Sequence, residues 1–148
     1  RILSNSEFNQ KKELCLSASK KMNLNNLCEK EIISKEDIEI LSDEEFKVCK
    51  HVVEENVRVK KAVQFLKDDN PNEFGKLMTE SHLSLSKYFG VSTGELNKLV
   101  SLSNSFGALG SKLTGAGFGG AVVTLVKNDK VEELEKMILE NYNKAKFI

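Results

Sequence analysis

The first hundred residues carry apolar side chains at helical spacing. One such segment runs from Ser6 to about Met22, and its apolar side consists of Phe8, Leu14, Cys15 and Ala18. Residues 23–31 have no clear period and are predicted to be irregular, whereas Ser34 to about Ile40 predicts a short helix. The chain is therefore expected to begin with two helices joined by a loop.

The longest periodic segment begins at Ser42 and extends to about Lys67. Ser42 and Glu45 have the spacing of a capping box, in which each side chain accepts a hydrogen bond from the other residue's backbone N–H. Pro71 cannot continue this helix but suits the first turn of the next one. The expected apolar side of the helix consists of Phe46, Cys49, Val53, Val57, Val63 and Leu66.

Two more helices are predicted before residue 106. The first runs from about Pro71 to Phe89 and ends at Gly90, a residue type that readily adopts the left-handed conformation beyond a helix end. Its inward side is expected to hold Phe74, Leu77, Met78, Leu85 and Phe89. The second begins with a capping box of Ser92 and Glu95 and runs to about Ser103.

After Phe106 the pattern changes from helices to strands. Residues 108–113 and 121–126 predict strands, residues 131–142 predict an amphipathic helix, and Phe147 and Ile148 are expected to begin a further strand. This order predicts an α+β fold with helices packed on one face of a small antiparallel sheet. Because no internal linker is visible, residues 1–148 are expected to form a single domain.

Composition narrows the possible partners and the compartment. Lys and Arg number 22 and Asp and Glu number 22, so no basic excess favours nucleic acid or an anionic membrane. No apolar run reaches membrane-spanning length. Cys15, Cys28 and Cys49 fit neither a metal-site spacing nor a disulfide framework, which indicates a reducing, cytoplasmic location.

Glycine is concentrated in one short stretch near the predicted strands. Six of the nine glycines lie between Gly107 and Gly120, and residues 115–120 match G-x-G-x-x-G. A dinucleotide-binding fingerprint needs a helix after this string, but residues 121–126 predict a strand. Gly-Lys-Ser/Thr, which a P-loop requires, is also absent. The glycines are therefore expected to join two strands, either as a tight connection or as a loop that presses its backbone against a ligand.

The glycine stretch resembles a signature motif of the GHMP kinases, and within them the galactokinases. Residues 112–120, Lys-Leu-Thr-Gly-Ala-Gly-Phe-Gly-Gly, resemble the third motif of that family. His51–Asn56, Phe74–Leu85 and Val91–Leu96 resemble the helices that precede it, in the same order and spacing. The resemblance covers essentially the whole chain.

The resemblance implies a C-terminal domain of a two-domain sugar kinase. The family's N-terminal half carries Gly-Glu-His and Gly-Leu-Ser-Ser-Ser motifs, with the catalytic aspartate and arginine, and neither string occurs here. We therefore expect a fragment whose partner is the missing N-terminal half and whose final strand is truncated. The intact enzyme would transfer the γ-phosphoryl group of ATP, with Mg²⁺, to the C1 hydroxyl of galactose.

Two alternatives to galactose phosphorylation remain open. One is a kinase for a related sugar such as N-acetylgalactosamine, and the other is a galactokinase-like sensor that binds sugar without turnover. By itself the chain is expected to be inactive, with no catalytic residue, no metal site and no bound cofactor.

The resemblance also implies which residues line the cleft. The loop would lie beside the substrate and the phosphate-binding loop of the other half. Phe118 would pack against the other domain and leave the flanking amides facing the site, and Thr114 would donate a hydroxyl there or satisfy a neighbouring backbone group. The expected site residues of the loop are Thr114, Gly115, Ala116, Gly117, Phe118, Gly119 and Gly120.

Phe8 is the remaining expected site residue, and it departs from the family pattern. Galactokinases typically show Tyr-Asn-x-Arg-Arg where this chain has Phe8, Asn9, Gln10, Lys11 and Lys12. Phenylalanine keeps the apolar wall of the sugar site but lacks the hydroxyl that contacts the sugar. Lysine cannot form the planar two-pronged hydrogen bonds of arginine. From the residues alone, Phe8 would be a core residue and the lysines a solvated face.

The two histidines are expected to be structural. His51 and His82 lie on predicted helices 31 residues apart, and no nucleophile–base pair or metal-binding set accompanies either one. Glu54, Glu55 and Glu80 are expected to be solvated or paired within their helices.

Overall fold

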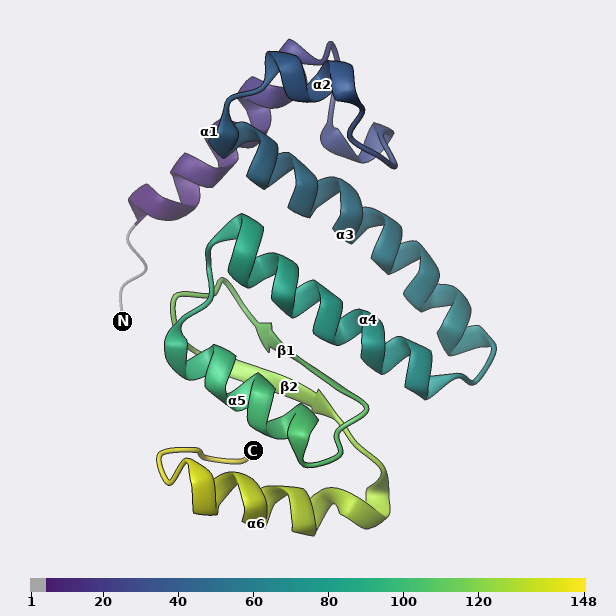
Figure 1. The fold of residues 1–148 in the computed structure, drawn as a ribbon, viewed down its shortest axis with the longest axis vertical. Coiled ribbons are helices and arrows are strands. Elements are labelled where there is room, and N and C mark those ends of the chain that lie inside the picture. The colour runs from purple at the N-terminus through teal and green to yellow at the C-terminus, as the bar shows by residue number, and fades with distance from the viewer. Residues whose placement is uncertain (1–4) are drawn as a thin grey trace. The chain divides into compact units, whose positions relative to one another are not determined.

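The computed structural model describes the backbone of residues 5–148 and the side chains of these residues except Asn5, Ser6 and Phe8. Figure 1 shows the elements along the chain. They group into two compact units. Unit 1 comprises the described residues up to Lys61 together with Lys87–Gly90, and unit 2 comprises Ala62–Ser86 and Val91–Ile148.

Unit 1 consists of helices. It contains α1 (Asn5–Lys21), the 3₁₀ helix η1 (Leu27–Glu29), α2 (Lys35–Ile40) and the first part of α3 (Asp43–Lys67). The helices expected in this region are confirmed, while part of the segment expected to be irregular forms η1. The buried core of unit 1 is formed by Ala18, Leu27, Cys49 and Val53.

Glu45 joins α1 to the start of α3. The predicted capping box is present, because the Glu45 N–H donates to Ser42 Oγ at 3.3 Å and the Ser42 N–H donates to Glu45 Oε2 at 2.8 Å. From α1, Ser17 Oγ donates to the same carboxylate at 2.7 Å and Lys21 Nζ at 2.6 Å. Hydrogen bonds from Lys21, Ser17 and Ser42 hold the pKa of Glu45 at about 2, so the carboxylate stays charged although the residue is only 4% exposed.

The apolar side expected for α3 is only partly covered. Cys49 and Val53 are buried, but Val63 is 47% exposed and Leu66 is 62% exposed. Helical spacing identifies residues that share a side of a helix, and it does not say how far along the helix that side is covered. Val63 and Leu66 therefore continue the apolar side of the helix but lie largely exposed.

Unit 2 combines helices with a two-stranded sheet. After the last turns of α3 come α4 (Pro71–Ser84), α5 (Gly94–Ser105), β1 (Gly110–Thr114), β2 (Ala121–Leu125), the 3₁₀ helix η3 (Asn128–Lys130) and α6 (Val131–Asn141). The strands are antiparallel, with Gly110 opposite Leu125 and Thr114 opposite Ala121. Helix α4 packs against β1, and α5 packs against both strands and against α6. The α+β fold is thus confirmed.

The ends of two elements differ from expectation. The helix that begins at Pro71 continues past Ser84 as a π-helical turn, Leu85–Phe89, and ends at Gly90, whose φ is +72°. Sequence periodicity does not distinguish such a turn from α-helix. No strand forms at Phe147 and Ile148 in the described chain, because a strand requires a backbone partner there.

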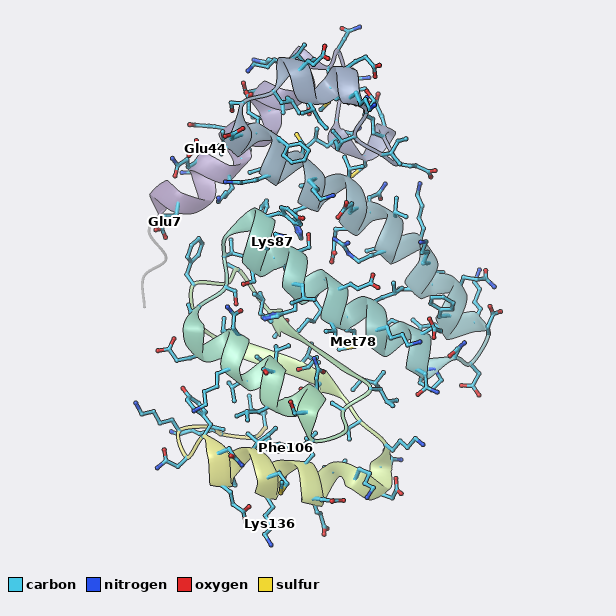
Figure 2. The ribbon with its side chains drawn as sticks, in the orientation of Figure 1. Glu7, Glu44, Met78, Lys87, Phe106 and Lys136 are labelled. Atoms are coloured by element: carbon cyan, nitrogen blue, oxygen red, sulfur yellow. The ribbon has the colours of Figure 1, made fainter. Side chains whose placement is uncertain are left out.

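The side chains of α6 illustrate how unit 2 separates polar from apolar groups. Leu134 and Ile138 are each 4% exposed, whereas Lys136 points away from α5 (Figure 2). This is the amphipathic pattern predicted for residues 131–142.

Helix α4 covers the outer edge of β1. Thr79 Oγ1 accepts the N–H of Ser111, and His82 Nδ1 accepts the N–H of Leu113, both at 3.3 Å. One turn earlier, the backbones touch directly, because a Cβ atom on Gly75 would overlap the carbonyl group of Leu109. Side chains of one helix face therefore satisfy the backbone groups that β1 does not share with β2.

We expect Gly75→Ala to destabilise the protein by about 1–3 kcal/mol, the usual cost of overpacking a core. In an exposed helix the same change would stabilise by up to about 1 kcal/mol. The sign of the change in unfolding free energy therefore tests whether the backbones of α4 and β1 approach closely at Gly75. Urea unfolding measures the change. Gly94→Ala is the matched control, since nothing lies within 4 Å of its added Cβ, and it is expected to change stability by less than about 0.5 kcal/mol. Equal effects of the two variants would contradict the packing argument.

Candidate functional site

The loop between β1 and β2 is built largely from left-handed residues. Five of its residues have positive φ: Gly115 (+83°), Gly117 (+81°), Phe118 (+57°), Gly119 (+123°) and Gly120 (+103°). Residues other than glycine rarely adopt positive φ, so the four glycine positions among these five favour glycine because of their backbone conformation. The string that resembles a nucleotide-binding motif is thus a strand-to-strand loop, as the sequence predicted.

Val91 holds the middle of the loop. The Phe118 N–H donates to the Val91 carbonyl oxygen at 2.7 Å, and Val91 is 4% exposed. A Cβ atom on Gly117 would overlap the Val91 carbonyl oxygen and lie 2.7 Å from the Val91 Cβ. A side chain at position 117 is therefore disfavoured twice, by the positive φ and by the Val91 backbone next to it.

The first part of the loop is open. Thr114, Gly115 and Ala116 are exposed, and no atom lies within 4 Å of a Cβ added to Gly115. Within the described chain, the amides of Gly115, Ala116, Gly117, Gly119 and Gly120 have no hydrogen-bond acceptor, whereas that of Phe118 is occupied by Val91. The flanking amides can therefore donate to an added group, but the Phe118 amide cannot. Such an arrangement can hold an oxygen-rich ligand or a neighbouring loop.

The structure brings the seven loop residues together but does not describe the eighth expected site residue. Phe8 belongs to α1, and its side chain lies outside the described residues. Its role in a sugar site stays a prediction.

Behind the loop, His82 is a buried and hydrogen-bonded residue, as expected for a structural histidine. It is 2% exposed, and because Nδ1 accepts the Leu113 N–H, the ring proton is assigned to Nε2, which lies 3.0 Å from Asn97 Oδ1. Burial lowers the pKa of His82, the Asn97 hydrogen bond opposes that shift, and the nearby Lys112 charge adds to it. His82 is therefore a neutral link between α4, α5 and β1.

The start of α5 differs from the sequence prediction by one residue. Thr93, rather than Ser92, is the N-cap, because Thr93 Oγ1 accepts the Leu96 N–H at 3.3 Å. The Ser92 hydroxyl instead donates to Asn97 Oδ1 at 2.6 Å. Two adjacent hydroxyl residues offer alternative caps, and only the fold decides between them. Sequence reasoning thus missed the contact of Val91 with the loop and the hydrogen bonds of Asn97 to Ser92 and His82.

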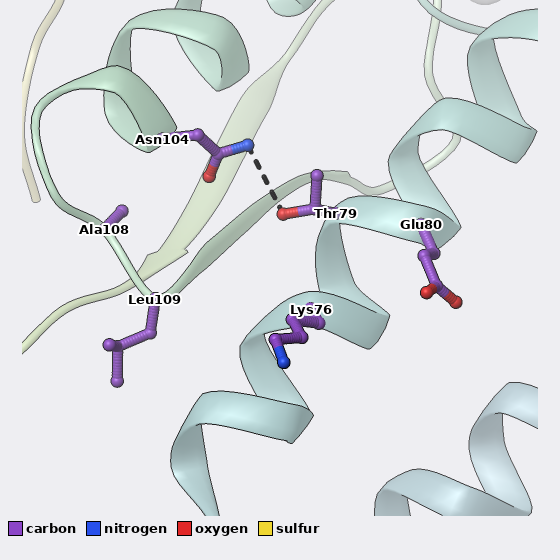
Figure 3. A pocket seen from close by; sticks show the side chains of 6 residues that line it. All are labelled: Lys76, Thr79, Glu80, Asn104, Ala108 and Leu109. Atoms are coloured by element: carbon purple, nitrogen blue, oxygen red, sulfur yellow. Dashed lines mark hydrogen bonds between the residues drawn. The ribbon is translucent and has the colours of Figure 1, made fainter.

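Two shallow cavities lie beside α4 and α5, and the loop does not line either of them. One, of about 380 Å³, is lined by Lys76, Thr79, Glu80, Asn104, Ala108 and Leu109 (Figure 3). There, Asn104 Nδ2 donates to Thr79 Oγ1 at 3.3 Å. The second, of about 440 Å³, shares Thr79 and Asn104 and also contacts His82 and Asn97. Beside these two cavities the loop stands apart, with Thr114, Gly115, Ala116 and Gly120 exposed.

Metal-ligating side chains do not gather in groups of three in the described part of the chain. No group of three His, Cys, Asp or Glu side chains in residues 5–148 is arranged to hold a metal ion. In the same part of the chain, none of the helices combines the length and apolar character needed to span a membrane. Cys15, Cys28 and Cys49 are free thiols.

Known proteins match this chain over almost all of its length. The sequence profile described as "GHMP kinases C terminal" matches residues 62–144. The galactokinase of Fusobacterium nucleatum is 39% identical over 96% of this chain and 39% of the relative, and that of Clostridium acetobutylicum is 40% identical over 96% and 38%. A crystal structure of Lactococcus lactis galactokinase complexed with galactose superposes with a TM-score of 0.85 at 31% identity, covering 97% of this chain and 39% of that one. The chain thus spans about two fifths of the length of these relatives.

We expect acid to weaken the fold through His82. Its pKa in the folded chain lies below the ordinary 6.5, so the unfolded chain takes up the proton first, and stability falls as the pH drops below about 6.5. His82→Asn keeps an acceptor for the Leu113 N–H but cannot titrate. The free-energy difference between wild type and His82→Asn, measured by urea unfolding at pH 7 and pH 5, should therefore shrink at pH 5. An unchanged difference would rule out His82 as the titrating group.

Proposed function

This chain belongs to the GHMP kinase family, and we propose that it is the C-terminal part of a galactokinase. The whole enzyme would transfer the γ-phosphoryl group of ATP to the C1 hydroxyl of galactose. The observation that carries the proposal is the similarity to galactokinases over 96–97% of the chain, in sequence and in fold.

In this proposal the loop forms one wall of the substrate cleft. Phosphoryl transfer depends mainly on holding the reacting groups in place and on stabilising charge. Val91 holds the loop at Gly117 and Phe118, and the amides of the exposed residues Gly115 and Ala116 beside them would donate hydrogen bonds to a bound group. ATP, bound with Mg²⁺, supplies the phosphoryl group. We propose that the rest of the enzyme holds the metal and the phosphates, since the N-terminal half of the family carries the phosphate-binding motif.

We further propose that residues 1–148 form one domain, with the N-terminal part of the same enzyme as its partner. Helix α3 runs without a break through both units, which supports a single domain. We propose a cytoplasmic location, which the free thiols of Cys15, Cys28 and Cys49 support. The zero net charge gives no support for a nucleic-acid partner.

A coupled ADP-release assay on the full-length protein tests the proposal. We expect galactose-dependent ADP release with Mg-ATP that exceeds release with N-acetylgalactosamine. Preference for N-acetylgalactosamine would assign the related kinase activity. Calorimetric galactose binding without turnover would indicate a sensor instead.

Ala116→Leu tests the role of the loop without disturbing its backbone. Ala116 is exposed and has no positive φ, so we expect the free energy of unfolding to change by less than about 0.5 kcal/mol. The larger side chain would occupy the proposed cleft, and kcat/KM for galactose should fall at least about tenfold, equivalent to about 1.4 kcal/mol. Asn143→Leu, at an exposed position outside the loop, should leave kcat/KM unchanged. A fully active Ala116→Leu enzyme would remove the loop from the site.

Phe8→Tyr tests the sugar site. If Phe8 lines that site, the added hydroxyl supplies one hydrogen bond worth roughly 0.5–1.5 kcal/mol, which should lower the Kd for galactose about two- to tenfold. Calorimetric titration of the full-length protein measures the change, with glucose as the control ligand. Weaker galactose binding by the tyrosine variant would show that Phe8 does not occupy the family's tyrosine position.

A further inference from the structure

The glycine loop is anchored at two points, its entry and its middle. The entry is Leu113, which immediately precedes Thr114. The middle is Gly117 and Phe118, which rest on Val91. Both anchors lead to the same buried side chain.

The entry is anchored directly. His82 Nδ1 accepts the Leu113 N–H at 3.3 Å, and both residues are 2% exposed. Since β1 turns this N–H away from β2, an acceptor from another element is needed to keep the buried group satisfied. His82 supplies it from α4.

The middle is anchored through two more residues. His82 Nε2 lies 3.0 Å from Asn97 Oδ1, and the same oxygen accepts the Ser92 hydroxyl at 2.6 Å. Ser92 follows Val91 in the chain, and the Val91 carbonyl accepts the Phe118 N–H at 2.7 Å. Asn97 Oδ1 is thus the shared acceptor that links the support of the loop's middle to the support of its entry.

We propose that His82, Asn97 and Ser92 are positioning residues that fix the glycine loop in the geometry needed for phosphoryl transfer. This inference rests on the proposed function, because the loop must line the cleft for its position to affect turnover. The three side chains act through the backbone of Leu113, Val91 and Phe118 and do not touch the substrate. His82 is thus connected by hydrogen bonds to Leu113 at the loop's entry and, through Asn97 and Ser92, to the segment that holds Phe118 in its middle. A shift of one of these two points is therefore coupled to a shift of the other.

Amide hydrogen exchange tests the anchoring without reference to activity. In the full-length protein, Ser92→Ala should speed exchange at Phe118 about two- to tenfold and leave Leu113 unchanged, as expected for loss of one ordinary hydrogen bond. In His82→Gln the side-chain NH₂ group can take the place of Nε2 and donate to Asn97, but no acceptor remains at the position of Nδ1. The variant should therefore speed exchange at Leu113 and spare Phe118. Ser105→Ala is the matched control, since among the described residues that hydroxyl bonds only to the Ser101 carbonyl on its own helix, and it should change neither rate.

Kinetics then tests the effect on turnover. We expect Ser92→Ala to lower kcat about two- to tenfold while KM for galactose stays within about twofold, and Ser92→Thr, which keeps the hydroxyl, to restore kcat. If Ser92 only stabilised the fold, Ser92→Ala would lower the amount of folded enzyme, and kcat per folded molecule would stay that of the wild type.

The outcomes separate this inference from the proposed function. Unchanged exchange at Phe118 in Ser92→Ala overturns the anchoring, whatever the activity. Faster exchange with a wild-type kcat shows that the residues hold the loop but do not position it for transfer, which also overturns the inference. If the wild-type protein phosphorylates no sugar, the proposed function fails and the kinetic claim with it, while exchange still decides the anchoring.

Discussion

The contact between α4 and β1 is the constraint on which unit 2 depends. A two-stranded sheet leaves the outer edge of each strand without backbone partners, and the outer N–H groups of β1 are buried. Thr79 and His82 accept two of them, which requires the helix to lie directly against the strand. Only residues without a side chain permit that approach, and Gly75 and Gly110 meet at the point of contact.

This contact also determines where the glycine loop begins. With Ser111 and Leu113 bonded to α4, the end of β1 has little freedom, so Thr114 starts from a fixed place. Val91 then holds Gly117 and Phe118, and the chain returns as β2. The loop therefore has a defined shape before any ligand arrives, and such preorganisation reduces the entropy lost on binding.

Sequence reasoning predicted features that depend on neighbouring residues and missed those that depend on distant ones. The capping box of Ser42 and Glu45 and the turn between two strands at residues 115–120 follow from local backbone chemistry, and both are present. The cap at Thr93 and the exposure of Leu66 depend on which surfaces the fold covers. For the candidate site, sequence reasoning proposed the loop, which remains a prediction, but could not identify Val91, because no local pattern marks the residue on which a loop rests.

The glycines of this chain serve different physical purposes. Gly75 and Gly110 are required by close approach, whereas Gly117 is required both by close approach to Val91 and by its positive φ. Gly115 has a positive φ, but apart from its chain neighbours no atom lies within 4 Å of a Cβ added there. The open side at Gly115 and its unbonded amide are the features on which the proposed role of the loop in the substrate cleft depends.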